Sequence, residues 1–210
     1  HDQGGGDLFD WTKTADDDYF ITVGDVMGKG VRAKFYAFSF LSYVRGTLHA
    51  MLRESDSPAE LLRRVNQMLI EDEVMEETFA SLLLLNWDPK RHTITYANAG
   101  HCRPVLVRPN GAEIVAHSDL ILGLEPGTQF TDSTIELPPN SALMLYTDGL
   151  MEQRLPSGNT LGEDGVMDLA AEALTAEEPI QALLNDALDR SEATEFEDDI
   201  LVFWLQRAND

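Results

Sequence analysis

The sequence predicts an α+β fold in which antiparallel sheets are covered by helices. Its apolar pattern indicates one strand, two helices, a block of strands, two more helices and a last strand, in that order along 210 residues. Turn-forming runs such as Asp88-Pro89 and Pro109-Asn110-Gly111 separate the strands of the block, which is typical of hairpins. With 43% hydrophobic residues, the chain is expected to fold as one domain, residues 1–210.

The first half of the chain begins with a strand and continues with helices. The first clear strand is predicted at residues 19–25, where β-branched and aromatic residues alternate before a glycine-rich turn. A long helix is expected over residues 31–52. Residues 57–60 (Ser-Pro-Ala-Glu) form a capping box with proline at the first helical position, so a second helix begins there.

From residue 80 the pattern changes to that of strands. Strands are expected at residues 80–87, 93–97, 105–108, 130–137 and 142–147. Helical spacing returns over residues 166–173 and 180–188, and a last strand is expected at 200–205.

Charge and composition exclude several classes of protein. Asp and Glu number 37 against 15 Lys and Arg, and the resulting net charge of −22 would repel the phosphates of nucleic acid. No apolar run approaches the ~20 residues of a membrane-spanning helix, so no membrane insertion is expected. The single cysteine, Cys102, excludes an internal disulfide, which fits a cytoplasmic location.

Four aspartates lie where a short carboxylate can point into a cleft, at a strand end or in a tight turn. They are Asp7, Asp25, Asp148 and Asp198. Any one alone is ordinary turn chemistry. Carboxylates gathered in one site repel one another unless cations compensate their charge, and hard oxygen ligands suit Mg²⁺ or Mn²⁺. Together they predict a site for two metal ions, as in-line attack on phosphorus requires.

Six motifs spread over nearly the whole chain contain these aspartates. They are Gly-Gly-Asp-Leu-Phe-Asp at 5–10, Gly-Asp-Val-Met-Gly-Lys-Gly at 24–30, Thr-Phe-Ala-Ser at 78–81, Asn-Ala-Gly-His at 98–101, Tyr-Thr-Asp-Gly at 146–149 and Glu-Asp-Asp-Ile at 197–200. In this order they resemble the metal-dependent protein phosphatase family (PPM, protein phosphatase 2C-like), and within it the bacterial branch of the SpoIIE and RsbU type. As an ordered set the motifs are highly specific.

The resemblance implies a fold, an activity and a set of ligands. The fold would be a four-layer α-β-β-α sandwich, with two antiparallel sheets packed face to face and flanked by helices. The activity would be hydrolysis of phosphoserine or phosphothreonine in proteins by a water that bridges two Mn²⁺ or Mg²⁺ ions. Asp25 would bridge both ions, the Val26 carbonyl would bind one of them, Asp148 and Asp198 would hold the other, and Asp7 would bind through coordinated water. Asp199 stays an alternative to Asp198.

The sequence departs from the family pattern near its start. Met27 stands where eukaryotic relatives carry a histidine, and residues 1–3 (His-Asp-Gln) stand where those relatives carry a phosphate-binding arginine. Phosphate binding is therefore expected to rest on the metals and on Lys29 or Lys34. The chain also opens almost on its first motif, so its N-terminal edge is expected to be truncated.

The resemblance also implies partners. Relatives act on a phosphoserine of STAS-type anti-sigma-factor antagonists in bacterial partner switching, and they commonly lie behind a sensor or receiver domain. A phosphorylated protein substrate and such an upstream domain are therefore expected here.

Four alternatives compete with this reading. Residues 101–108 fit the His-Cys-five-residues-Arg pattern of phosphatases that use a cysteine such as Cys102, but Pro104 and the strand-like residues that follow disfavour a phosphate loop. The glycine-rich turn at 24–30 lacks the spacing of a P-loop, and residues 16–18 lack the alternating ligands of a calcium loop. An inactive phosphoprotein-binding module is disfavoured because all four aspartates are present.

Overall fold

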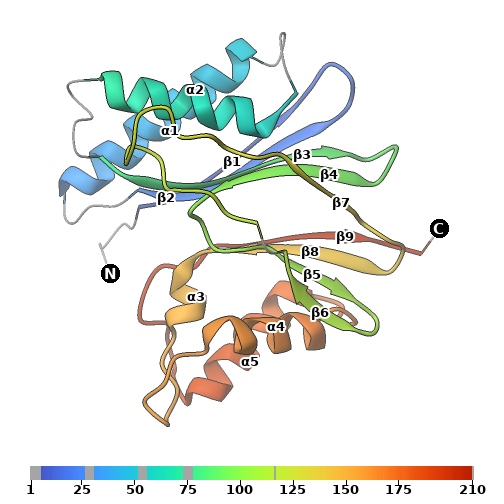
Figure 1. Cartoon of the computed structure of the whole chain (residues 1–210). Helices are drawn as coiled ribbons and strands as arrows, with labels where there is room; N and C mark the ends of the chain where they lie inside the picture. Colours follow the sequence, from blue (N-terminus) through green and yellow to red (C-terminus); the bar gives the residue numbers. More distant parts are fainter. Residues whose placement is uncertain (1–5, 27–30, 52–55, 73–77, 116, 210) are drawn as a thin grey trace. The chain divides into compact units, whose positions relative to one another are not determined.

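The structure is a computed structural model that describes residues 6–26, 31–51, 56–72, 78–115 and 117–209. The chain divides into two compact units, His1–His101 with His117–Glu136, and Cys102–Ala116 with Leu137–Asp210. Each unit contains one antiparallel sheet (Figure 1).

The first unit contains a five-stranded sheet in the order β1-β2-β3-β4-β7. Its strands are β1 Asp7–Lys13, β2 Tyr19–Val26, β3 Ala80–Asp88, β4 Thr93–Ala99 and β7 Ser133–Glu136. Two helices, α1 Val31–Met51 and α2 Pro58–Glu71, cover one face of this sheet (Figure 1).

Alternation along the strands decides which side chains meet these helices. In β3, Leu82 and Leu84 belong to the same buried cluster as apolar residues of α1 and α2, such as Phe40 and Leu62. Successive side chains of a strand point to opposite faces, so Ser81 lies on the face away from α1 and α2. Residues directly opposite Ser81 on neighbouring strands also lie on the face away from α1 and α2.

The second unit contains a four-stranded sheet in the order β6-β5-β8-β9. Its strands are β5 Val105–Arg108, β6 Gly111–Ile114, β8 Ser141–Tyr146 and β9 Val202–Arg207, and its helices are α3 Asp148–Glu152, α4 Gly162–Ala173 and α5 Pro179–Ser191. Apolar residues of α4 and α5, such as Leu169 and Leu183, form one buried cluster with Val105 and Met144 of the sheet.

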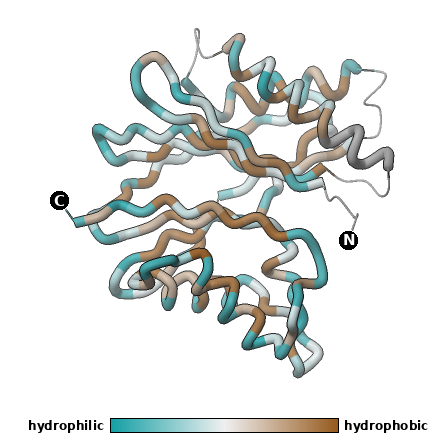
Figure 2. Tube along the Cα trace, turned by 180° about the vertical axis from the view of Figure 1, so that it is seen from behind, coloured by the Kyte–Doolittle hydropathy of each residue, from teal (hydrophilic) through white to brown (hydrophobic). Residues whose placement is uncertain are grey.

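Hydrophobic residues follow the strands of each sheet, and hydrophilic residues gather at the turns (Figure 2). Within the described ranges, no helix is both long enough and apolar enough to span a membrane.

The predicted α+β class, with two antiparallel sheets and helices on each, is confirmed. The predicted strand at 105–108 is confirmed without change, and the predicted start of α2 is confirmed at the N-cap Ser57, whose hydroxyl accepts a hydrogen bond from the Glu60 N–H at 3.1 Å. The other predicted elements are confirmed with shifts of a few residues at their ends.

Three elements were not predicted, and one strand was predicted too long. The missed elements are β1, β6 and α3, which have seven, four and five residues. Of the strand expected at 130–137, only β7 forms a strand. The residues before β7 belong to an irregular segment attached to α2. There, the Asp132 carboxylate accepts hydrogen bonds from the Ala59 N–H and the Ser57 hydroxyl.

Candidate metal centre

Asp7 and Asp25 lie opposite each other in the β1–β2 hairpin. Asp7 is the first residue of β1, Asp25 is the last but one of β2, and both are half-buried. Directly opposed residues of an antiparallel pair project from the same face. The hairpin therefore places two of the four predicted carboxylates side by side, on the sheet face away from α1 and α2.

Oxygens of two predicted ligands, Asp25 and Val26, point towards the backbone of Gly6. A Cβ at Gly6 would lie 2.3 Å from Asp25 Oδ1 and 2.3 Å from the Val26 carbonyl oxygen. The Val26 N–H donates a hydrogen bond to the Gly6 carbonyl at 3.2 Å, which holds the two segments together. A carboxylate oxygen and a carbonyl oxygen thus share one small space, and hard oxygens are the donors that Mg²⁺ and Mn²⁺ prefer.

Residues of two further motifs contact each other next to Asp25, on the side of strand β3. Ser81 of β3 is the residue opposite Asp25, and its hydroxyl lies 2.8 Å from His101 Nδ1. The buried Asn98 side chain fixes the backbone of His101. It accepts a hydrogen bond from the His101 backbone N–H at 2.8 Å and donates one to the His101 backbone carbonyl at 3.0 Å. The motifs at 78–81 and 98–101 therefore support the strand that carries Asp25, a role that their sequences alone did not reveal.

In the second unit, Asp148 begins α3 directly after β8, and its side chain is exposed. Tyr146, the last residue of β8, lies two positions before Asp148, and burial raises the pKa of its phenol, so the phenol stays neutral. Gly149 follows, and a Cβ there would lie 2.3 Å from the Asp199 carbonyl oxygen. The glycine of the Thr-Asp-Gly motif therefore lets two segments approach closely.

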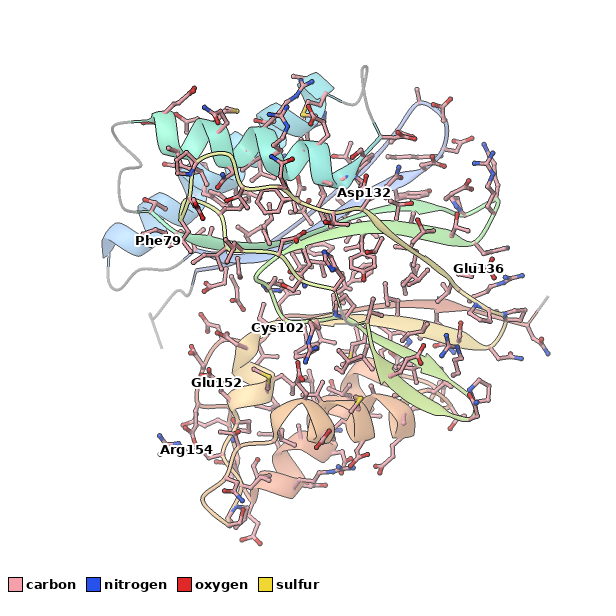
Figure 3. All side chains as sticks on the ribbon, viewed as in Figure 1. Phe79, Cys102, Asp132, Glu136, Glu152 and Arg154 are labelled. Atoms are coloured by element: carbon pink, nitrogen blue, oxygen red, sulfur yellow. The ribbon has the colours of Figure 1, made fainter. Side chains whose placement is uncertain are left out.

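Asp198 lies in the loop before β9, and its exposed carboxylate accepts a hydrogen bond from the Asp199 N–H at 2.8 Å. A cavity of about 480 Å³ adjoins this loop. Its lining residues are Gly149, Met151, Glu152, Gln153, Arg154, Thr160, Gly162, Glu197 and Asp198. Arg154, labelled in Figure 3, follows α3, and its Nε lies 3.5 Å from Glu197 Oε2.

Each unit by itself therefore contributes two of the four predicted aspartates. Across the described residues, no group of three or more His, Cys, Asp or Glu side chains lies close enough together to hold a metal ion. The assignment of Asp7, Asp25, Asp148 and Asp198 to one centre stays a prediction, as does the choice between Asp198 and Asp199. The donor set fits Mg²⁺ or Mn²⁺, because all its atoms are carboxylate or carbonyl oxygens.

The structure does not describe the side chains of the two lysines predicted to bind phosphate. Lys29 lies outside the described residues, and only the helical backbone of Lys34 in α1 is described. Their role stays a prediction.

The segment around Cys102 has the structure that the sequence predicted for it. Val105–Arg108 forms β5, which pairs with β6 and β8, so these residues form no loop around a phosphate. The guanidinium of Arg103 binds Glu163, with Nε–Oε1 at 3.0 Å, and that of Arg108 lies 2.6 Å from Glu113. Both arginines are therefore engaged by carboxylates, whereas a cysteine phosphatase needs one of them on phosphate.

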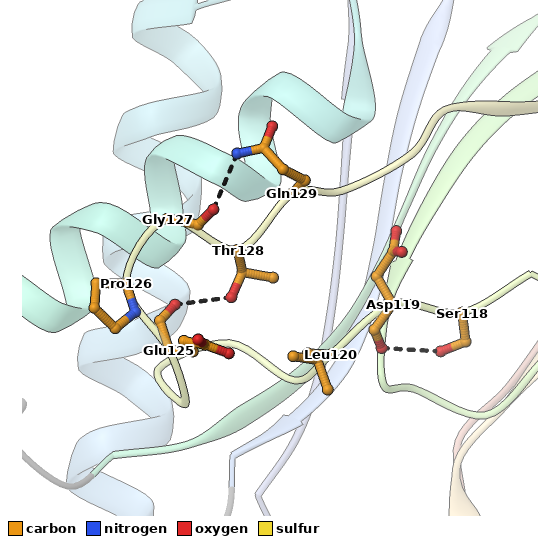
Figure 4. A pocket seen from close by; sticks show the side chains of 8 residues that line it. All are labelled: Ser118, Asp119, Leu120, Glu125, Pro126, Gly127, Thr128 and Gln129. Atoms are coloured by element: carbon orange, nitrogen blue, oxygen red, sulfur yellow. Dashed lines mark hydrogen bonds between the residues drawn. The ribbon is translucent and has the colours of Figure 1, made fainter.

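A further cavity of about 480 Å³ in the first unit contains none of the predicted ligands (Figure 4). It is lined by Ser118, Asp119, Leu120, Glu125, Pro126, Gly127, Thr128 and Gln129. The buried Asn66 of α2 fixes this loop by donating to the Glu125 carbonyl at 3.0 Å and accepting from the Gly123 N–H at 2.8 Å.

Solved structures with the same fold define the class of protein. The SiaA-PP2C domain of Pseudomonas aeruginosa matches with a TM-score of 0.82, 20% sequence identity, and coverage of 96% of this chain and 80% of that chain. The RsbU and RsbW domains of Rv1364c from Mycobacterium tuberculosis match with a TM-score of 0.76 and 29% identity, over 98% of this chain and 57% of that chain. The fold is that of the protein phosphatase 2C-like (PPM) class.

Sequence comparison then gives the family. The chain belongs to the SpoIIE family (Stage II sporulation protein E), which it matches over residues 15–208. Among curated relatives, the phosphoserine phosphatase RsbP of Bacillus subtilis is 26% identical over 70% of this chain, and the phosphoserine phosphatase RsbU of the same organism is 24% identical over 66%. The matched regions cover 36% and 40% of those two proteins.

Proposed function

We propose that this chain is a metal-dependent protein serine/threonine phosphatase that hydrolyses phosphoserine or phosphothreonine with water as the nucleophile. The observation that carries the proposal is the shared space beside Gly6, into which Asp25 Oδ1 and the Val26 carbonyl oxygen both point. Asp7 lies opposite Asp25 and adds a second carboxylate on the same face. Membership of the SpoIIE family and the names of RsbP and RsbU support the reaction class.

In this proposal the protein residues bind and orient, and none of them becomes phosphorylated. Asp25 and the Val26 carbonyl of the β1–β2 hairpin would hold the metal ions, with Asp7 acting through water, and Asp148 and Asp198 of the second unit would supply the remaining ligands. When bound, two Mn²⁺ or Mg²⁺ ions supply the positive charge that lowers the pKa of a water and offsets the charge of the phosphoryl oxygens. Lys29 or Lys34 would hold the remaining phosphate oxygens. A neighbour of the same fold, RsbX, was solved in complex with magnesium, which supports the choice of ion.

The proposed substrate is a phosphoserine on a folded protein, a STAS-type anti-sigma-factor antagonist in the cytoplasm. Because Met27 and residues 1–3 replace the histidine and the phosphate-binding arginine of eukaryotic relatives, selectivity is expected to come from a wide docking surface on a protein. An upstream sensor or receiver domain is proposed as the regulator, since the matched regions leave more than half of RsbP and RsbU uncovered.

The test of the activity is hydrolysis of p-nitrophenyl phosphate with and without metal. EDTA is expected to abolish the activity and added Mn²⁺ to restore it, because the reaction needs the ions to acidify water. Full activity in excess chelator, with metal content measured as nil, would refute the proposal.

The test of the substrate compares kcat/KM for three substrates at saturating Mn²⁺. They are a phosphorylated antagonist protein, a phosphopeptide containing the same phosphoserine, and a small phosphomonoester. The folded protein is expected to give the highest value. Equal values for all three would show that docking contributes nothing to selectivity.

A further inference from the structure

The segment that carries Asp148 also holds both ends of the loop that carries Asp198. At one end, the Gln153 Oε1 accepts a hydrogen bond from the Glu197 N–H at 3.2 Å. At the other end, the Thr147 hydroxyl accepts from the Leu201 N–H at 3.0 Å, and the Thr147 N–H donates to the Leu201 carbonyl at 3.1 Å. The residues between these anchors include Asp198 and Asp199.

The middle of this loop is also set against the same segment. The Asp199 carbonyl oxygen faces the Cα of Gly149, where a Cβ would approach to 2.3 Å. The loop belongs to no helix or strand, and the side chains of Asp198 and Asp199 are exposed. Its backbone position therefore depends on contacts with residues 147–153 rather than on regular secondary structure.

Gln153, like Thr147, is a buried residue whose side chain holds this loop. It is 1% exposed, and its backbone carbonyl accepts a hydrogen bond from the Leu161 N–H at 2.9 Å. The backbone hydrogen bond and the burial of the side chain leave Gln153 little freedom to move, so its Oε1 is a fixed acceptor for the Glu197 N–H. Removing that acceptor would deprive a backbone N–H next to Asp198 of its partner.

We infer that Gln153 is a positioning residue, which fixes the Asp198 loop relative to Asp148 so that the two carboxylates are preorganised for a divalent cation. The inference rests on the proposed function, because it assigns these two aspartates to metal binding. Partners that orient ligands in this way affect metal affinity by about 10- to 100-fold. No pattern in the sequence identified Gln153, since a lone glutamine after a short helix is unremarkable until its burial is known.

The experiment uses Gln153→Met, which keeps the length of the side chain and removes the acceptor. Mn²⁺ binding is measured by isothermal titration calorimetry, and kcat is measured as a function of Mn²⁺ concentration. The variant is expected to bind Mn²⁺ at least about 10-fold more weakly than the wild type. Its kcat is expected to recover towards the wild-type value at saturating Mn²⁺, because the ligands themselves remain.

The matched control is Asn66→Leu, which removes another buried side-chain amide that is 1% exposed and fixes a loop. It is expected to lower the melting temperature while leaving Mn²⁺ affinity unchanged, because Asn66 holds the 123–125 segment and no predicted ligand. If Gln153→Met fails to fold, Gln153→Asn replaces it, because it keeps an amide but withdraws the acceptor by one methylene. It too is expected to weaken Mn²⁺ binding.

The outcomes separate the inference from the function on which it rests. A wild-type protein that binds no Mn²⁺ would refute the proposed function. Wild-type binding together with unchanged affinity in folded Gln153→Met or Gln153→Asn would refute the inference alone. Equal loss of affinity in Asn66→Leu would also refute it, because the effect would then follow from general destabilisation.

Discussion

Asp7 and Asp25 are directly opposed residues of the β1–β2 hairpin, and their carboxylates project from the same face of the sheet. Without a cation, two carboxylates in such positions repel each other and destabilise the hairpin. With a cation, the same charges attract it. Removing one of the two charges should therefore stabilise the metal-free protein and destabilise the metal-loaded protein.

Asp25→Asn tests this relationship because it removes one charge and preserves size. The metal-free variant is expected to melt at the same or a higher temperature than the wild type, whereas the rise in melting temperature on adding Mn²⁺ should disappear. The kcat is expected to fall at least about 100-fold, because Asp25 is proposed to bind both ions. Asp88→Asn is the control and should keep the response to Mn²⁺, because Asp88 ends β3 and its carboxylate accepts hydrogen bonds only from the N–H groups of Lys90 and Arg91 among the backbone contacts described. A normal Mn²⁺ response in Asp25→Asn would place the site elsewhere.

Gly6→Ala probes the space beside Asp25. The added Cβ would lie 2.3 Å from both Asp25 Oδ1 and the Val26 carbonyl oxygen, so either both oxygens or the backbone of residue 6 must move. Mn²⁺ affinity, measured by calorimetry, is expected to fall. The control is Gly46→Ala in α1, where a Cβ meets nothing within 4 Å, and it should raise the free energy of unfolding by roughly 0.5–1 kcal/mol without changing Mn²⁺ binding. Wild-type Mn²⁺ affinity in Gly6→Ala would mean that these oxygens bind no metal.

Cys102→Ser distinguishes the two phosphatase chemistries. The variant is expected to keep nearly all activity on p-nitrophenyl phosphate, because water is the proposed nucleophile and Arg103 and Arg108 are engaged by Glu163 and Glu113. A cysteine enzyme would lose its attacking group and become inactive. An inactive Cys102→Ser protein that folds and binds Mn²⁺ would therefore reverse this assignment.

Glu60 of α2 gives a prediction for the dependence of stability on pH. Hydrogen bonds from Arg63 and then Arg64 lower the pKa of its carboxyl from 4.5 to about 2. A carboxyl whose pKa is lowered by folding stabilises the protein above its unfolded pKa, and this contribution is lost as the pH falls towards the folded pKa. Glu60→Gln should therefore cost up to about 1 kcal/mol at pH 7, since the pair is partly exposed.

The measurement for Glu60 is urea denaturation of both proteins between pH 7 and pH 3. The difference in free energy of unfolding between wild type and Glu60→Gln should stay constant down to about pH 5 and then narrow. A difference that stays constant to pH 3 would show that the arginines do not hold this carboxyl in solution.

The sequence predicted the long elements well because each carries a strong local signal. Apolar alternation marked β2, and Ser57 with Pro58 marked the start of α2. The elements that were missed are short or polar: β1 contains Asp10, Thr12 and Lys13, and its pairing with β2 supplies the stability that its own sequence does not indicate.

The sequence named candidate ligands for the site, but it did not indicate the contacts around them. Asp25 and Asp148 stood out because glycines accompany them, but the reason for Gly149 is its approach to Asp199, fifty positions further on. Likewise, the bonds between Ser81 and His101 and between Gln153 and Glu197 join residues far apart in the chain. Such contacts depend on tertiary structure, which a local pattern does not contain.

The two halves of the proposed ligand set differ in how the chain must assemble them. Asp7 and Asp25 belong to one hairpin, so their meeting needs the closure of only a short loop, an event on the order of 1–10 µs for hairpins. In the proposed set, Asp148 and Asp198 would come together only after a longer segment containing α4 and α5 has folded back and β9 has paired with β8. Closing the longer loop costs more entropy, so contacts between these parts are expected to form later during folding. An isolated hairpin is only marginally stable. Cations present during synthesis would therefore meet one half of the proposed ligand set before the other half has formed.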